Sequence, residues 1–397
     1  MRHRYGIIGA GRQGVAAAYD LCVRGEAETV VFADRVPETG MRAAEIVAGL
    51  VSDVSDVDVS HEILDATDRG AVEEFMARFD VVLGSASWRL NVGLTEAAIA
   101  AGTHFADLGG NAEVVWAQFE ADEAARAAGV GIVPDCGQVP GTGANLMAYV
   151  ARSFDEADTV VLYDGGIPAS PEPPWNYRLT FNMDGLTNEY WGHALYIIDG
   201  EQRPVEVFDP DEYETLEFDQ FGTLEAFVTA GGLTTLSRTL EGQIKTLKNK
   251  TLRYPGHVAQ FKAFRDAGLF DEEPIMVGDV KVVPRDVFHA LIEPKIRAPE
   301  DFRDVIVNRV VGRGVIDGND HEIILDVISY PPEDLPFTAM QAATGWHAAI
   351  IMHRLATGLC GPGVVEVENA IDGGDLLDEF RQRGFHVSER RRLLDEE

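Results

Sequence analysis

The stretch of sequence that decides the fold is YGIIGAGRQGVAAAYD, residues 5–20. A short apolar run is followed by Gly9, Gly11 and Gly14 and then by an alanine-rich helical pattern. In this context the first glycine permits a tight turn, the second lets the backbone approach a pyrophosphate, and the third lets helix and strand pack closely. The stretch therefore predicts a Rossmann domain in which amides at the start of a helix hold the phosphates of a dinucleotide.

A second signal for the dinucleotide is Asp34, which ends the next β-rich run 20 residues after Gly14. An acid at this place accepts hydrogen bonds from the ribose of NAD and repels the additional phosphate of NADP. Arg35 follows directly and could cover that phosphate, so we favour NAD while NADP stays open. Asp34 as a simple turn residue is the competing interpretation. We expect the cofactor to contact Gly9, Gly11, Arg12, Gln13, Gly14, Asp34, Arg35, Asp65, Ser85, Ala86 and Ser87.

Short β-rich runs alternate with helical stretches over the first 135 residues, which is typical of a doubly wound parallel sheet with helices on both faces. We predict strands at 5–8, 29–33, 57–63, 81–84, 104–107 and 130–134. Helices are predicted at 14–24, 92–101 and 113–128, each followed by a glycine that ends it.

The rhythm changes after about residue 135 into longer, mixed segments with proline-rich turns. We therefore predict an α/β chain with a Rossmann domain over 1–135 and an α+β domain over 136–338 for the substrate or for dimerisation. Residues 339–357 form an apolar helical run that must be buried, either on the Rossmann sheet or in a dimer interface. We expect 339–397 to pack back on the first domain and the protein to be a homodimer.

The charge of the chain excludes several kinds of partner. Asp and Glu number 66 against 33 Lys and Arg, so the net charge of −33 would repel nucleic acids and acidic membrane surfaces. No apolar run reaches the roughly 18 residues of a membrane span, and the sequence opens directly on a predicted strand, so we expect a cytoplasmic protein without a signal peptide. The spread of the acids favours a surface adapted to concentrated salt. The three cysteines have no CxxC or zinc spacing, which predicts no metal site.

Further blocks of sequence follow one another along nearly the whole chain. They read DLGG (107–110), PDCGQVPG (134–141), GGIP (165–168), FGTLEAF (221–227), GG (231–232), TLRYPGH (251–257), RGF (383–385) and SE (388–389). In this order they resemble the saccharopine dehydrogenase family and, within it, the lysine 6-dehydrogenases. One departure is VTAGG at 228–232, where the family pattern has HTSGG, which leaves the exact substrate open.

The resemblance implies an NAD-dependent oxidoreductase acting on a small amino acid. The reaction implied is oxidative deamination of the ε-amine of L-lysine to allysine, which cyclises to piperideine-6-carboxylate. Related members act instead on saccharopine or carboxynorspermidine, by reductive amination in the reverse direction. A Rossmann protein of another class, which only senses NADH, is the third alternative, and the arginine-bearing second domain argues against it.

Two aspartates are candidates for the proton transfers of such a reaction. Hydride can leave the substrate carbon only when the nitrogen is uncharged, and the ammonium of lysine has a pKa of about 10.4. The site must therefore first remove a proton. Asp107 and Asp135 end the fifth and sixth predicted strands, where they could hold the ammonium, relay its proton and later activate water. Helix capping is an equal alternative for both.

Positive charge is concentrated over residues 238–253, which is unusual in so acidic a chain. It indicates a pocket for an anionic substrate group or, for the lysines, a solvated helix face. Arg253 lies in the TLRYPGH block, which resembles a substrate-carboxylate contact of saccharopine reductases, and a guanidinium grips a carboxylate with two hydrogen bonds. His257 as a base and Tyr177 as a polar wall are further candidates, with packing as an equal alternative for each.

Overall fold

The computed structural model describes residues 2–299 and 301–394 and divides into two compact units. Unit 1 comprises Met1–Tyr149, Thr234–Leu236 and Pro332–Arg383. Unit 2 comprises Val150–Leu233, Ser237–Pro331 and Gly384–Glu397. The sequence predicted a first domain over 1–135 with 339–397 packed back on it. In the structure unit 1 extends to Tyr149 and includes the returning segment 332–383 together with 234–236, whereas residues 384–394 belong to unit 2.

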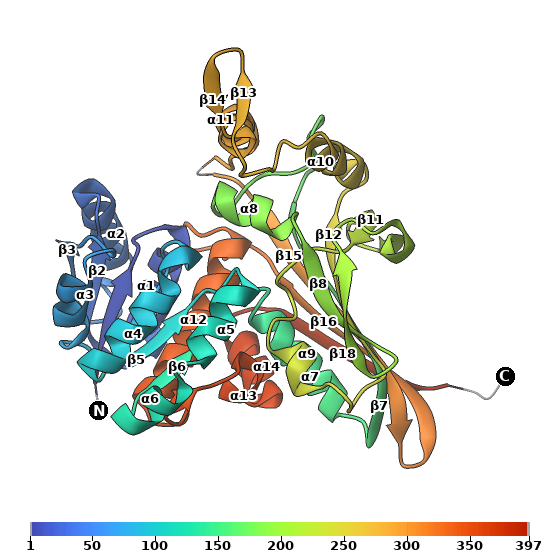
Figure 1. Cartoon of the computed structure of the whole chain (residues 1–397). Helices are drawn as coiled ribbons and strands as arrows, with labels where there is room; N and C mark the ends of the chain where they lie inside the picture. The colour runs from blue at the N-terminus through green and yellow to red at the C-terminus, as the bar shows by residue number, and fades with distance from the viewer. Residues whose placement is uncertain (1, 300, 395–397) are drawn as a thin grey trace. The chain divides into compact units, whose positions relative to one another are not determined.

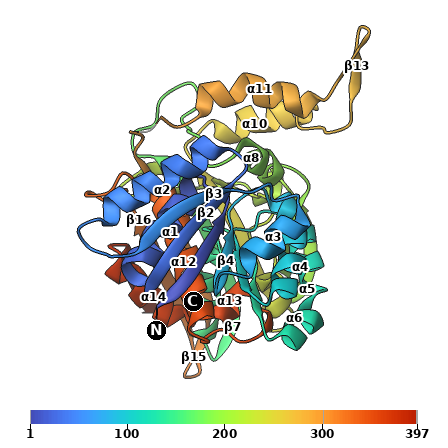
Figure 2. The same cartoon turned by 90° about the vertical axis from the view of Figure 1, so that its left-hand side faces the viewer.

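Unit 1 is built on a parallel sheet in the order β17-β6-β5-β4-β1-β2-β3, and Figures 1 and 2 show its helices on both faces. The strands are β1 His3–Ile8, β2 Ala27–Asp34, β3 Asp58–Ile63, β4 Val81–Gly84, β5 His104–Asp107, β6 Gly131–Val133 and β17 Gly363–Val364. The strand order reverses beside β1, where β2 and β4 flank it. This arrangement is the predicted Rossmann fold, in which ligands bind beyond the carboxyl ends of the strands.

The helices predicted at 14–24, 92–101 and 339–357 are present in unit 1, together with several that were not predicted. They are α1 Arg12–Arg24, α2 Pro37–Val51, α3 Arg69–Met76, η1 Trp88–Leu90, α4 Asn91–Ala101, α5 Ala112–Phe119, α6 Asp122–Ala128, α12 Ala339–Ala356, α13 Val367–Ala370 and α14 Gly373–Gln382, with α7 Thr142–Arg152 at the boundary between the units. The single helix predicted at 113–128 is wrong. The Ala121 N–H donates to the carbonyl of Gln118 (3.0 Å), a tighter turn that ends α5, and Ala121 is the N-cap of α6.

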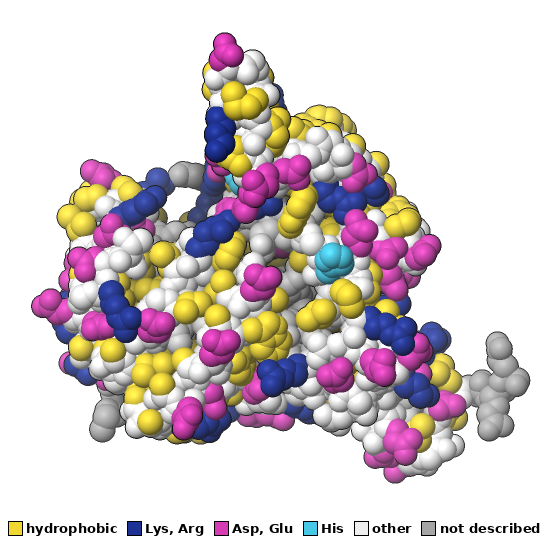
Figure 3. Space-filling view, in the orientation of Figure 1, with side chains coloured by type: hydrophobic (Ala, Val, Ile, Leu, Met, Phe, Trp, Pro, Cys, Tyr) yellow, Lys and Arg dark blue, Asp and Glu magenta, His cyan; other side chains and the backbone are white. Residues whose placement is uncertain are grey.

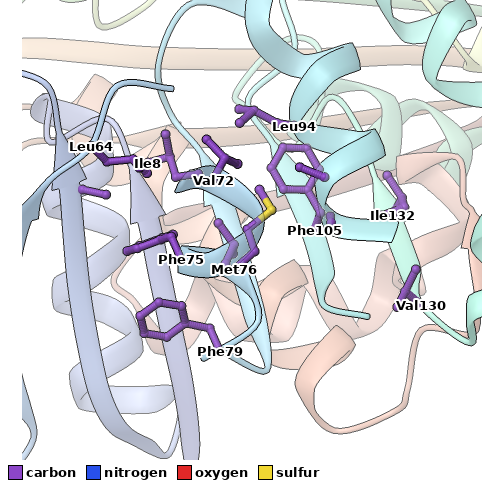
Figure 4. Close-up of a cluster of buried hydrophobic side chains, with 14 of the residues drawn as sticks. Ile8, Leu64, Val72, Phe75, Met76, Phe79, Leu94, Phe105, Val130 and Ile132 are labelled. Atoms are coloured by element: carbon purple, nitrogen blue, oxygen red, sulfur yellow. The ribbon is translucent and has the colours of Figure 1, made fainter. Parts of the chain in front are cut away.

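A buried apolar cluster fills the space between the sheet and helices α3 and α4 (Figure 4). Ile8, Phe105 and Ile132 come from the strands, while Phe75 and Leu94 come from the helices. Strands that are buried on both faces read as continuous apolar runs, which explains why their positions were predictable. The cluster holds the carboxyl ends of β1, β4 and β5 in fixed places.

Helix α12 packs on α1, β4 and β5 of unit 1, so it takes the first of the two positions that the sequence left open. Gly345 makes the close crossing possible, because a Cβ there would lie 2.7 Å from the Gln13 carbonyl oxygen. Thr338 and Gln341 cap the helix reciprocally. Within the described residues, no helix combines the length and the apolar character needed to cross a membrane.

Unit 2 is a mixed sheet with the strand path β10-β11-β12-β7-β15-β16-β18 and with β8 and β9 added at β12. Its strands are β7 Glu156–Pro168, β8 His193–Ile198, β9 Glu201–Glu206, β10 Glu214–Phe218, β11 Gly222–Phe227, β12 Thr246–Arg253, β15 Asp304–Ile316, β16 Asn319–Ser329 and β18 His386–Leu393, and a separate hairpin is formed by β13 Ile275–Val277 and β14 Val280–Val282. The helices are α8 Met183–Glu189, η2 Pro210–Glu212, α9 Leu236–Thr239, α10 His257–Asp266 and α11 Pro284–Ile296. The sheet and helices together give the predicted second domain of mixed α and β structure.

The last strand departs from the expectation that 339–397 packs entirely on the first domain. Strand β18 pairs with β16 in the sheet of unit 2. Arg392 forms an ion pair with Glu322 (2.7 Å), and Arg390 lies 3.5 Å from Asp326. These ion pairs and the backbone ladder hold the described part of the chain's end in the second sheet, whereas α12 to α14 belong to the first unit. Residues 395–397 lie outside the described residues.

Candidate functional site

The glycine-rich turn after β1 has the geometry that a dinucleotide requires. Gly9 has a φ of +99°, and a Cβ there would lie 2.7 Å from the Ala86 amide nitrogen. A Cβ on Gly14 would lie 2.7 Å from the Gly9 carbonyl oxygen. By contrast, a Cβ on Gly11 would meet nothing within 4 Å among the described residues, so this backbone borders open space. Two glycines thus build the turn, and the third leaves room for a ligand.

The surroundings of the turn also suit a phosphate. Ser85, which follows β4, donates a hydrogen bond to the Gly9 carbonyl (2.5 Å) and so braces the turn from the neighbouring strand. Helix α1 begins after Gly11 and, among the described residues, has neither a side-chain cap nor an acid in its first turn. The amides of Arg12 and Gln13 open this helix, and its positive dipole end favours an anion. Ala86 is exposed at the same turn.

Asp34 ends β2 beside this turn. One carboxylate oxygen accepts a hydrogen bond from the Ala10 amide (3.0 Å), and the other accepts one from the Val36 amide (2.9 Å). Each oxygen retains a further lone pair, which a ribose hydroxyl could use. Arg35 is exposed, and hydrogen bonds from Thr67 together with the charge of Arg35 lower the pKa of the Asp65 carboxyl. Asp65 and Ser87 are exposed. The carboxylate of Asp34 fits the ribose of NAD, and the exposed Arg35 beside it leaves NADP possible.

Asp107, at the end of β5, is fully engaged by its own domain. Its carboxylate accepts hydrogen bonds from the Gly109 amide (2.8 Å) and from the Gln118 side chain (2.7 Å), and the Asp135 amide lies at 3.5 Å. Burial raises its pKa to about 6, while these hydrogen bonds act in the opposite direction. The side chain is completely buried and fixes the loop after β5, so its geometry favours a positioning role.

Asp135, just after β6, differs from Asp107 in its hydrogen bonding. Its side chain is 1% exposed, yet among the described residues neither carboxylate oxygen has a partner in hydrogen-bonding geometry. Its φ of +63° lies in the left-handed region, and such backbone conformations are concentrated at functional sites. Burial, followed by the charge of Asp107, raises its pKa well above the ordinary range, although Thr234 and the Gly110 amide lie near enough to oppose the shift. A buried carboxyl of this kind can take up and release a proton.

Three further polar residues of unit 1 surround this part of the domain, and the sequence analysis did not identify them as site residues. Glu368 is 1% exposed and accepts a hydrogen bond from the Thr235 hydroxyl (2.6 Å), and its charge also acts on Asp135. His347 lies within hydrogen-bonding distance of the Cys136 carbonyl (2.9 Å). They come from segments more than 90 residues away in the chain, and no local motif marks them.

Arg253 is the centre of a second polar cluster, which lies within unit 2. It ends β12, is 5% exposed and donates a hydrogen bond to the Leu252 carbonyl (2.9 Å). Its Nε has no partner among the described residues. The guanidinium carbon lies 5.2 Å from the centre of the Tyr177 ring, whose hydroxyl is also without a partner in the described part of the chain. A buried guanidinium with an unused donor is suited to an anionic ligand group.

His257 packs in the same cluster at the start of α10. Its Nε2 lies 2.8 Å from the Tyr190 hydroxyl, and its ring stacks on Phe261 at 4.2 Å between centroids. Burial, with a further contribution from Arg253, lowers its pKa well below the ordinary range. A histidine with so low a pKa accepts a proton poorly, which argues against the base role and favours a positioning role.

The lysines of the 238–253 stretch do not lie on a helix face, because residues 246–253 form strand β12 between β7 and β11. Lys248 pairs with Glu212 (2.6 Å), and Lys250 pairs with Glu214 (2.7 Å). Lys245 pairs with Asp158. The helix interpretation is therefore wrong, and acids distant in the sequence balance these charges. Among the described residues, no group of three His, Cys, Asp or Glu side chains is placed to hold a metal ion.

Comparison with known proteins adds a family to this geometry. Residues 5–133 match the family model described as the saccharopine dehydrogenase NADP binding domain, and residues 139–385 match the saccharopine dehydrogenase C-terminal domain. A saccharopine dehydrogenase (L-Glu forming) from Saccharomyces cerevisiae aligns with a TM-score of 0.77 at 17% identity, over 98% of this chain and 100% of that one. A myo-inositol dehydrogenase from Corynebacterium glutamicum aligns over 100% of both chains with a TM-score of 0.40 and 13% identity.

The two family models together cover nearly the whole chain, and the glycine-rich turn at residues 9–14 lies within the first of them. The chain therefore belongs to the saccharopine dehydrogenase family of NAD(P)-dependent oxidoreductases.

Proposed function

We propose that the protein catalyses the NAD-dependent oxidative deamination of the ε-amine of L-lysine to allysine. The observation that carries the proposal is the carboxyl of Asp135, which is buried and has no partner among the described residues of a domain with a dinucleotide turn. A buried carboxyl is costly unless a ligand or a proton compensates it. The ammonium of an amine substrate would supply both, since it can donate a hydrogen bond and then a proton.

The proton transfers are assigned to Asp135. Its raised pKa makes it a stronger base than an ordinary carboxylate, so it can take the proton that the ammonium must lose. Asp107 holds the loop and adds the negative charge that raises this pKa further. Bound NAD would accept the hydride from the carbon that carries the neutral amine. Once Asp135 has passed that proton to solvent, its carboxylate takes a proton from the water that attacks the resulting iminium, and ammonia leaves as allysine forms.

Arg253 is assigned to the carboxylate of the substrate. Its Nε–H is a free donor in the described residues, and the neighbouring Tyr177 hydroxyl can give a second hydrogen bond. A planar guanidinium discriminates a carboxylate from a neutral group through two directed hydrogen bonds. The choice of NAD over NADP follows from Asp34, whose charge would repel the additional phosphate.

The test is NADH formation with a panel of amino acids, followed by the two aspartate variants. We expect turnover with L-lysine, a fall of about 100-fold or more in kcat for Asp135→Asn, and a smaller effect for Asp107→Asn. Formation of NADH with saccharopine and not with lysine would contradict the proposal. So would a near-normal rate for both variants.

A saccharopine dehydrogenase activity is the second candidate, because the yeast structure with a TM-score of 0.77 carries that name. The same Asp135 and Arg253 roles would serve it, since it also exchanges hydride at a carbon bound to nitrogen. Carboxynorspermidine as substrate would need only one carboxylate contact. Comparing kcat/KM for lysine, saccharopine and carboxynorspermidine separates the three.

We also propose that the protein is adapted to concentrated salt. The net charge is −33, and Figure 3 shows Asp and Glu side chains scattered across the face in view. Repulsion among surface acids is screened over about 3 Å at 1 M salt. We expect the melting temperature to rise with KCl concentration, and an unchanged melting temperature in dilute buffer would contradict the adaptation.

A further inference from the structure

Arg253 and Glu189 are oppositely charged residues of unit 2 that form no ion pair with each other among the described residues. Glu189 ends α8, and each of the two charges acts on the pKa of the other. In the part of the chain that the structure describes they form no ion pair, and the hydrogen bond that Arg253 makes goes to the Leu252 carbonyl. Arg253 is 5% exposed, and a buried guanidinium normally pairs with an acid in its neighbourhood, because an unpaired buried charge is costly.

The polar groups around this pair are also unsatisfied. The Tyr177 hydroxyl, the Arg253 Nε and the His257 Nδ1 are buried and lack a partner among the described residues. The Tyr190 hydroxyl lies 2.8 Å from the other ring nitrogen of His257, Nε2. Tyr190 directly follows Glu189 in the sequence. Buried polar groups are usually hydrogen-bonded, and three unsatisfied atoms gathered in one cluster favour a ligand with several polar groups.

A second acid of the cluster is already engaged. The Asp164 carboxylate accepts a hydrogen bond from the Asn249 side chain (2.6 Å), and burial raises its pKa to about 6. Glu189 receives no such bond in the described residues, and part of its side chain remains in contact with solvent. Glu189 is therefore the acid that an incoming cation can reach.

We propose that Glu189 receives the α-ammonium group of the amino-acid substrate while Arg253 holds its α-carboxylate, so that the cluster selects a zwitterionic head group. This inference rests on the proposed function and names the part of the substrate that unit 2 recognises. A zwitterion presents a carboxylate and an ammonium on one carbon, which matches an arginine with an unused donor among the described residues and a glutamate without an ion pair there. Glu189 joins this cluster through the next residue, Tyr190, whose hydroxyl lies 2.8 Å from the His257 ring. A simple amine or a simple carboxylate would satisfy only one of them.

The protonation of Glu189 gives an independent readout. Burial raises its pKa to about 8, and Arg253 acts in the opposite direction while Asp164 adds to the increase. An ammonium bound beside the carboxylate would favour the charged form and lower this pKa. Binding of a zwitterion near pH 7.5 should therefore release a proton, which calorimetry in buffers of different ionisation enthalpy detects.

The experiment compares L-lysine with 6-aminohexanoate, which lacks the α-ammonium group, in the wild type and in Glu189→Gln. We expect the variant to bind lysine roughly 10- to 100-fold more weakly, because a hydrogen bond between charged groups is lost. Its affinity for 6-aminohexanoate should stay the same, and the proton release should disappear. Asp184→Asn, a carboxyl in the first turn of the same helix, is the matched control and should bind both ligands normally.

Binding separates this inference from the proposed function. If the wild type prefers lysine over 6-aminohexanoate and the variant loses that preference, the inference holds even when no NADH is formed. If lysine is oxidised but Glu189→Gln keeps the wild-type preference, the inference is overturned and the proposed function stands. Should Glu189→Gln fail to fold, proton release by the wild type decides: equal release with both ligands overturns the inference.

Discussion

Two arginines, Arg383 in unit 1 and Arg253 in unit 2, both have largely buried side chains but make different contacts. The Arg383 guanidinium donates to both carboxylate oxygens of Asp20 (2.9 and 2.8 Å), and both side chains are 5% exposed. Arg253 has an unused donor in the described residues and an acid nearby that does not contact it. We call the Arg383 arrangement closed, because its donors are used within the protein and connect the end of α14 to α1. We call the Arg253 arrangement open, because a donor remains for a ligand.

The same contrast separates two aspartates of unit 1. Asp107 has partners for both carboxylate oxygens, whereas Asp135 has none in the described part of the chain. Burial and charge are therefore poor guides to function when taken alone. The informative property is whether the polar atoms of a buried group are satisfied within the domain. Closed groups should affect stability when altered, and open groups should affect ligand binding.

The largest effect is expected from Arg383→Met, which would leave the Asp20 carboxyl buried without its cation. Removing one partner of a buried pair costs about 3–5 kcal/mol in the free energy of unfolding. Denaturant unfolding of the variant measures this loss, and NADH affinity of the folded protein should be unchanged. The double variant with Asp20→Asn should recover part of the stability. If the free energy of unfolding fell by less than about 1 kcal/mol, the pair would contribute no more than an exposed ion pair and the distinction between closed and open arrangements would be wrong.

Arg253→Lys should have the next largest effect and should act on the substrate. Lysine keeps the charge but loses the planar fork, so we expect kcat/KM for L-lysine to fall by about 100-fold through a higher KM. The free energy of unfolding should change by less than about 1 kcal/mol. Lys245→Ala, which removes an exposed ion pair of the same stretch, serves as the control with normal kinetics. If the variant lost stability and activity to the same extent, Arg253 would have a structural role like that of Arg383.

Asp34→Asn extends the comparison to the cofactor. The variant can still accept a hydrogen bond from the Ala10 amide but no longer carries the charge that holds the ribose. We expect NADH to bind about tenfold more weakly and NADPH more tightly, because hydrogen bonds to charged groups contribute about 1.5 kcal/mol or more. Fluorescence titration with each cofactor measures the change. Tighter binding of NADPH than NADH by the wild type would contradict the assignment of NAD.

The smallest effect concerns the pH dependence of stability at Asp107. Its pKa in the folded protein is raised to about 6, so the folded state holds a proton that the unfolded state has already lost. The contribution of this group to stability is therefore present at low pH and is lost as the pH rises through about 6. Between pH 5 and pH 7 the difference in unfolding free energy between the wild type and Asp107→Asn should change by about 1 kcal/mol. A constant difference would contradict the raised pKa.

Local patterns were sufficient to predict most of the first domain. Strands 81–84 and 104–107 match the structure. The first is an apolar run between turn residues, and the second is a short β-rich run that follows the glycine at the end of a helix. The roles of Gly9 and Gly14 also follow from their spacing, since each closes against the neighbouring backbone. Asp107 and Asp135 were placed correctly at strand ends, but their different hydrogen bonding was not visible from the sequence.

Contacts between distant segments were not predictable. For the lysines of β12 the sequence left a substrate pocket and a helix face as equal alternatives, because their partners Glu212 and Glu214 lie 36 residues earlier in the chain. Glu189 carries no motif, and its importance depends on the unpaired state of Arg253. Glu368 reaches Thr235 from a separate segment of the same unit. Such pairs become apparent only once the topology is known.

The crossing of α12 over α1 has a consequence for biosynthesis. Helix α12 and strand β17 complete unit 1, but the ribosome makes them only after almost all of unit 2 has been translated. Until then the nascent amino-terminal segment exposes the apolar surface of α1 that Gly345 later covers. We expect this surface to be prone to aggregation until residue 339 and beyond are made, and a chain truncated before residue 339 to lack the helix that covers it.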